Sequence, residues 1–190
     1  MIATPLKWHF PIKQTRKHRL RRNEMEGKTH AIGGICLGVA AQSYYITDKL
    51  DAPELIVFYG ACLFGGLLPD ICHPGSWTGR RAKALSKGIS RFFGHRTITH
   101  SILFIILIYW LTSTFTFQYD HLIQTGLLVG IVSHIVLDGM TVRGIQLFYP
   151  IPLRVRFPLY LKTSSKGEGF ITSCLIILTI IMLYNQVMIS

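Results

Sequence analysis

Charged residues are scarce in this 190-residue sequence: Asp, Glu, Lys and Arg together make up 15% of it, whereas a soluble domain carries about 25%. Acidic residues are the scarcest, with nine against 20 Lys and Arg, which gives a formal net charge of +11. Hydrophobic residues reach 49% and the mean hydropathy is +0.38. This composition predicts a surface that faces lipid over much of its area, and the length suits a single domain.

Three further features are missing. The four cysteines, Cys36, Cys62, Cys72 and Cys174, lack the spacing of a disulfide framework or a zinc finger. A cleavable signal peptide is not expected, because the residues before Met25 are polar and basic and contain no apolar run. The apolar segments lack the polar face of soluble helices. We therefore expect an all-α, polytopic membrane helix bundle at residues 25–190, preceded by a basic, disordered cytoplasmic tail at residues 1–24.

Five apolar segments are predicted to be membrane helices: Ala31–Thr47, Pro53–Leu68, Ile102–Phe117, Leu122–Leu137 and Phe170–Met188. Several fall short of the roughly 20 residues of a full span, so tilt or bilayer thinning is needed. With the N-terminus inside, 19 of the 20 Lys and Arg lie on the cytoplasmic side and only Lys49 lies opposite. This distribution obeys the positive-inside rule and predicts a multi-pass protein with a cytoplasmic N-terminus.

The segments between the spans have their own patterns. Residues 76–93 interleave apolar and basic side chains, which fits an amphipathic helix on the anionic leaflet and, equally, a solvated helix. Residues 139–169 contain three prolines and are expected to be irregular and packed over the helix ends. Close helix packing is expected where the G-x-x-x-G spacing occurs, at Gly34 with Gly38 and Gly126 with Gly130.

Polar side chains gather at the predicted cytoplasmic helix ends: His30, Asp70, His73, His95, His100, His134, Asp138 and Glu168. His134 and Asp138 are four residues apart, so they share a helix face and can hold one ion. His95 lies too far from His100 for one face and is assigned to the preceding loop, while Thr99 is expected to cap the third helix. Imidazole and carboxylate ligands together predict a divalent metal, with zinc preferred over manganese or iron.

Simpler explanations exist for each residue taken alone. His134 and Asp138 could form a buried salt bridge, Ser165 and Glu168 could form a capping box, and Arg96 could bind lipid phosphate. Ionisable residues near a membrane core are costly and usually functional. Their gathering at one face therefore favours a functional site.

Five motifs, in order along the chain, resemble those of one family: "THAIGG", "LLPDICHP", "GHRTITHS", "SHIVLDGMT" and "YPIPLRVRFPLYLKTSSKGE". The sequence is similar from Met25 onward to the YdjM family of LexA-regulated inner-membrane proteins, which are inferred to be metal-dependent hydrolases. The resemblance implies the bacterial inner membrane and a relation to zinc-dependent phospholipase C and P1-type nuclease folds. It assigns the metal site to His30, Asp70, His95, His100, His134 and Asp138. Glu168 matches the family's Ser-x-x-Glu element, and Cys72 stands where members commonly have a second aspartate.

Together these patterns predict a membrane-bound metal-dependent hydrolase of phosphoesters or phospholipids at the cytoplasmic leaflet. The metal would activate water, His95 or Glu168 would transfer protons, and Arg96 would hold an anionic group. Membrane lipid is the expected partner, with anionic headgroups at the basic loops, and nucleic-acid binding is not expected. Two alternatives stay open: a non-catalytic module whose helix ends are fixed by metal, and a transporter, which the one-sided polar cluster disfavours.

Overall fold

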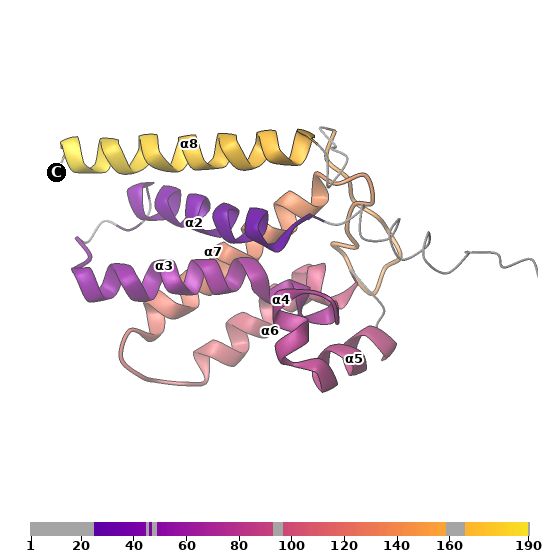
Figure 1. Ribbon diagram of the computed structural model, residues 1–190. Helices are drawn as coiled ribbons and strands as arrows, with labels where there is room; N and C mark the ends of the chain where they lie inside the picture. Colours follow the sequence, from indigo (N-terminus) through magenta and orange to yellow (C-terminus); the bar gives the residue numbers. More distant parts are fainter. Residues whose placement is uncertain (1–24, 45, 47–48, 93–96, 159–165, 190) are drawn as a thin grey trace, which may run out of the picture.

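The fold is a bundle of α-helices, as the sequence predicts (Figure 1). The computed structural model describes residues 25–44, 46, 49–92, 97–158 and 166–189, and the predicted tail at residues 1–24 lies outside them. Within these residues the only β-type pairing is an isolated bridge between Ile145 and Val155. The helices are α2 (Gly27–Tyr44), α3 (Ala52–Leu67), η1 (Leu68–Cys72), α4 (Trp77–Arg81), α5 (Lys83–Phe92), η2 (Ile98–His100), α6 (Ile102–Ser113), α7 (Asp120–Gly139) and α8 (Lys166–Ile189).

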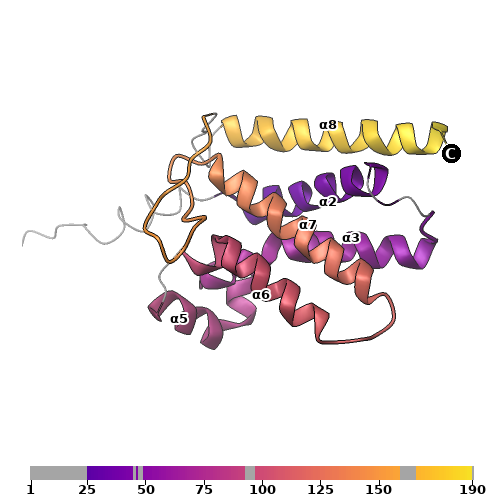
Figure 2. The same ribbon diagram turned by 180° about the vertical axis from the view of Figure 1, so that it is seen from behind.

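The long helices α2, α3, α7 and α8 run side by side, with α8 against α2 and α7 crossing behind α2 and α3 (Figures 1 and 2). Glycine sets how closely three of them approach. A Cβ atom at Gly34 of α2 or at Gly130 of α7 would collide with the carbonyl oxygen of Cys62 on α3. The close packing predicted from the G-x-x-x-G spacing is therefore confirmed, and α3 is the helix that the other two contact.

Within the described residues, three helical segments are long and apolar enough to cross a membrane: Ala52–Cys72, Asp120–Gly139 and Gly167–Met188. Helix α6 has 12 residues, which is about 18 Å at 1.5 Å per residue and shorter than the roughly 30 Å hydrocarbon core. The predicted end of this segment at Phe117 is wrong, since α6 ends at Ser113 and the chain then turns towards α7. The five-span topology stays a prediction.

Local sequence signals explain where several helices begin and end. Helix α3 starts with a capping box: Glu54 N–H donates to Asp51 Oδ1 and Asp51 N–H donates to Glu54 Oε2, each at 2.9 Å. The predicted amphipathic segment 76–93 forms two helices, because the backbone leaves the helical conformation at Ala82 between α4 and α5. Residues 93–96 lie outside the described part.

The connection after α7 is irregular, as its prolines predict. Ile145 in this connection is buried, Phe157 N–H donates to Gly139 O at 3.0 Å, and Leu147 O accepts from Ile102 N–H at 3.0 Å. Residues 140–158 therefore pack over the ends of α6 and α7. This layer and η1 surround the end of the bundle where the polar residues lie.

Candidate metal centre

Five of the predicted ligands meet at one end of the bundle, and they come from four elements. These ligands are His30 of α2, Asp70 of η1, His100 of η2, and His134 and Asp138 of α7. The two α7 residues lie one turn apart, as their spacing predicts. The side chains of His100, His134 and Asp138 are 0% exposed, that of His30 is 1% exposed, and that of Asp70 is 18% exposed. Burial of this many ionisable groups costs free energy unless they pair or bind a cation.

Asp138 lies at the centre of the cluster. Its Oδ1 is 3.4 Å from His30 Nε2, and its Oδ2 is 3.1 Å from His100 Nε2 and 3.7 Å from His134 Nε2. A second carboxylate oxygen, Asp70 Oδ1, lies 3.9 Å from His134 Nε2. One carboxylate thus faces three imidazoles, and a second carboxylate completes the set.

The remaining ring nitrogens fix the orientation of two of the histidines. Gly66 O can only accept a hydrogen bond, so His134 Nδ1, which lies 2.7 Å from it, must donate. His100 Nδ1 is 3.0 Å from Thr99 Oγ1, and His30 Nδ1 has no hydrogen-bond partner among the described residues. Binding of Nδ1 by a second group is the usual way a protein points Nε2 of a histidine at a metal.

The imidazole rings also crowd one another. His134 stacks on His30 with ring centroids 3.8 Å apart, and its Nε2 is 3.1 Å from His100 Nε2. Two donor groups emerge, each with ligand atoms within 4.8 Å: His30, Asp70 and His134, and His100, His134 and Asp138. Ligands about 2.0–2.2 Å from a tetrahedral ion lie roughly 3.3–3.6 Å from one another. The ligand atoms of His100, His134 and Asp138 are similarly spaced, at 3.1, 3.1 and 3.7 Å. The residues therefore fit a zinc-type divalent ion.

Cys72 borders this cluster. It is buried, and its side chain forms a hydrogen bond with His100. Burial lowers the pKa of His100, but the hydrogen bonds that His100 donates to Asp138 and Cys72 outweigh burial and raise the pKa to about 9. The metal-free cluster therefore holds a proton on His100 at neutral pH.

Two predicted site residues lie apart from the cluster. The His73 ring lies over Gly75, where it faces the cavity described below and belongs to neither donor group. Glu168 Oε1 accepts from Glu26 N–H at 2.6 Å and from Thr29 Oγ1 at 3.2 Å, so this carboxylate holds the start of α2 one residue before His30. The metal role of His73 and the proton-transfer role of Glu168 stay predictions.

The GHRTITHS motif is described only in part. His95 and Arg96 lie outside the described residues, and so does Ser165 of the suggested capping box. The capping role predicted for Thr99 is wrong: η2 intervenes before α6, Ser101 is the N-cap residue, and Thr99 contacts the His100 ring instead. Thr99 therefore orients the candidate ligand His100, whereas the sequence predicted that it would cap a helix.

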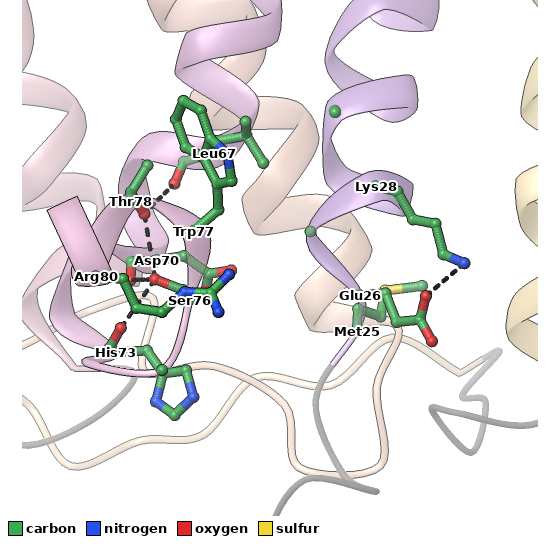
Figure 3. Close-up of a pocket in the computed structure, with 13 residues that line it drawn as sticks. Met25, Glu26, Lys28, Leu67, Asp70, His73, Ser76, Trp77, Thr78 and Arg80 are labelled. Carbon is green, nitrogen blue, oxygen red and sulfur yellow. Dashed lines mark hydrogen bonds and ion pairs between the residues drawn. The ribbon is translucent and has the colours of Figure 1, made fainter.

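A cavity of about 680 Å³ opens beside the cluster, between the start of α2 and the turn that joins η1 to α4 (Figure 3). We call it the α2–α4 pocket; its lining includes Met25, Glu26, Lys28, Ala31, Leu67, Asp70, His73, Trp77 and Arg80. Asp70 belongs to both the pocket and the cluster. Ser76 Oγ shapes the turn by donating to Asp70 O at 2.7 Å or His73 O at 2.8 Å.

Sequence reasoning missed the pocket. The sequence alone places Trp77 and Arg80 in a surface helix, because no spacing pattern links them to residues 25–31 of α2. The signal was indirect: a proline-flanked turn after η1 that folds α4 back toward α2.

Comparison with known proteins gives related sequences but no related structure. The sequence profile of a family described as "YdjM inner membrane protein" matches residues 25–189. The chain is 47% identical over 147 residues to the uncharacterized protein YvsG of Bacillus subtilis, an alignment that spans 77% of this chain and 87% of that protein. It is 32% identical over 161 residues to the inner membrane protein YdjM of Escherichia coli, with 80% of each chain covered. No solved structure matches.

Proposed function

Because the chain belongs to the YdjM inner membrane protein family, we propose that it is a membrane-bound, metal-dependent hydrolase that cleaves phosphoesters at the cytoplasmic face of the membrane. One observation carries the proposal. Three imidazole Nε2 atoms and two carboxylates converge in a buried cluster, and one of those carboxylates, Asp70, also lines an open pocket. A metal held there would be reachable from the pocket.

His30, Asp70, His100, His134 and Asp138 would hold the metal. A divalent ion bound by such ligands acidifies water to a pKa near 7 and stabilises charge that develops on a phosphoryl oxygen. The protein contributes the positions of the ligands: Gly66 O orients His134, and Thr99 Oγ1 orients His100. Burial of His30, His100, His134 and Asp138 keeps bulk water away from these side chains.

An anionic substrate suits the pocket that leads to Asp70. Arg80, Lys28 and His73 lie on its walls, and Arg80 forms no ion pair with any residue that the structure describes. A guanidinium group binds phosphate oxygens through two parallel hydrogen bonds. Arg96, which was predicted to hold the anion, is a second candidate for the same role.

The orientation of the bundle follows from charge. With the cluster end inside, the basic residues before α2, between α3 and α6, and between α7 and α8 all face the cytoplasm. Only Lys49 is opposite. We accordingly propose a multi-pass protein with its N-terminus and its site at the cytoplasmic face.

A non-catalytic role for the metal is the second candidate, favoured by the nearly complete burial of His30, His100, His134 and Asp138. Metal analysis of detergent-purified protein, followed by hydrolysis of bis-p-nitrophenyl phosphate, separates the two. An enzyme should show turnover that chelation abolishes and added zinc restores. Asp138→Asn should be inactive, while Asp120→Asn, at the far end of the same helix, should behave as wild type. Bound metal without turnover on any phosphoester would refute the hydrolase and leave the structural role.

A further inference from the structure

The α2–α4 pocket does not end at the helix ends. A second cavity, of about 270 Å³, lies along the bundle and is lined by Ala31, Ile32 and Ile35 of α2, Leu63 of α3, and Ile176 and Ile180 of α8. We call it the α8 groove. Ala31 lines both cavities, so they adjoin at this residue.

Helical spacing shows that the two cavities follow one another along the same face. On α2, Lys28 lines the pocket, Ala31 lines both cavities, and Ile35 lines the groove; residues three and four apart share a helix face. On α3, Leu67 lines the pocket and Leu63, one turn away, lines the groove. Helix α2 runs between α3 and α8, with α7 behind it (Figure 1), and the groove is lined by residues from α2, α3 and α8.

The two cavities differ sharply in chemistry. The pocket carries Arg80, His73 and Lys28, of which Lys28 is paired with Glu26 at 2.7 Å. The groove is apolar, and its one hydroxyl, on Thr179, donates to Leu175 O at 2.7 Å within α8. Polar groups thus lie at the end of the bundle, and the apolar α8 groove continues from them along the helices. A membrane lipid has the same order, with a polar headgroup followed by an apolar acyl chain.

We propose that these two cavities bind one membrane lipid that carries a phosphate headgroup, with the phosphate at Arg80 beside Asp70 and one acyl chain in the α8 groove. Cleavage of the bound lipid rests on the proposed hydrolase function, whereas binding of the lipid does not. It commits to a lipid over a water-soluble phosphate ester because a soluble ester would leave the groove unused. Arg80 complements the headgroup charge, and the exposed isoleucines of α8 face the bilayer in any spanning orientation.

A different apolar groove in the same protein provides an internal control. It lies between α2 and α7 and is lined by Leu37, Ala40, Tyr44, Leu128 and Val132. Its lining contains no Lys, Arg or His. A lipid held only by its acyl chain should occupy both grooves, whereas a lipid anchored by its headgroup should prefer the α8 groove.

The test uses the full chain in phosphatidylcholine vesicles that contain a trace of phosphatidic acid with a diazirine in one acyl chain. After photolysis, mass spectrometry compares labelling at Ile176 and Ile180 with labelling at Leu128 and Val132. We expect the α8 pair to be labelled about tenfold more, since one charge-assisted hydrogen bond from Arg80 anchors the lipid by about that factor. Arg80→Gln should remove the preference, and Ala31→Phe, which fills the junction, should do the same. The matched substitution Ala40→Phe, which fills the control groove, should leave labelling of the α8 pair unchanged.

Two outcomes would overturn the lipid assignment. Equal labelling of the two grooves in the wild-type protein would mean that lipid contacts the bundle without a headgroup site. Loss of labelling on addition of glycerol 3-phosphate at the same concentration as the lipid would mean that the pocket takes a soluble ester. Because labelling needs neither metal nor turnover, the result is independent of the hydrolase function. A protein that binds the lipid without cleaving it would refute only that function.

Discussion

The substitution Asp138→Asn should remove metal from the protein without unfolding it. Asp138 is the residue that all three histidines share, with carboxylate-to-Nε2 distances of 3.4, 3.1 and 3.7 Å. Asparagine has nearly the same shape and keeps one oxygen, so packing at this fully buried position changes little. What disappears is the negative charge that offsets a divalent ion.

The size of the effect follows from the position of Asp138. Changes to groups that merely support metal ligands typically lower metal affinity 10- to 100-fold. Asp138 is a direct ligand in our assignment, so the loss should be at least about tenfold, or roughly 1.4 kcal/mol. His134→Ala should have a similar effect, and the double variant should be little worse than either single one because the site is already lost.

Inductively coupled plasma mass spectrometry on monodisperse, detergent-purified protein gives the metal-to-protein ratio, and circular dichroism reports whether the helices persist. Asp120→Asn is the control, since Asp120 begins the same helix at the opposite end of the bundle. If His134 and Asp138 were only a structural salt bridge, their loss would lower the yield and melting temperature while the surviving protein kept its metal ratio. An unchanged metal ratio in well-folded Asp138→Asn protein would refute the assignment.

Four other predictions test the site and its orientation. Thr99→Val removes the hydroxyl next to His100 Nδ1 and should weaken metal binding about tenfold, the low end of the range for a group that supports a ligand, as titration with a competing chelator would show. Metal affinity should rise with pH, because the proton that metal displaces from His100 is held with a pKa of about 9; affinity that is flat between pH 6 and 9 would contradict this. In the metal-free protein the raised pKa of His100 also stabilises the fold. The full stabilisation is present below pH 6.5, the ordinary pKa of histidine, and it is lost as the pH rises through about 9. Chemical denaturation at several pH values measures this change in the free energy of unfolding. Reporter fusions after Asp51 and Tyr119 should read as external and fusions within Arg80–Arg91 as internal, and an internal reading at either turn would refute the proposed topology.

The sequence alone predicted the helices and most of the cluster because both depend on short-range patterns. An apolar run places a helix end, and a histidine or aspartate at that end joins the others once the bundle forms, as His30, His100 and Asp138 do. His73 did not follow this rule, because the 3₁₀ turn of η1 and the bend before Ser76 send its ring into the pocket.

Other features depend on contacts between distant segments, which no local pattern encodes. The cap predicted at Thr99 failed because a one-turn helix, η2, intervenes before α6. The α2–α4 pocket requires residues 25–31 to face residues 70–80 across the bundle end. The sequence suggested only a local capping role for the Glu168 carboxylate, which accepts hydrogen bonds from Glu26 and Thr29, about 140 positions earlier.

That long-range contact has a consequence for how the protein is made. Synthesis proceeds from the N-terminus, so His30 is made early, while Glu168 and α8 are made last. Until α8 arrives, the N–H of Glu26 and the hydroxyl of Thr29 lack the carboxylate that fixes the start of α2, and with it the backbone next to His30. A chain that ends before α8 would contain all five candidate ligands but would lack this support beside one of them. The start of α2 therefore gains its carboxylate partner only when the last helix has been made.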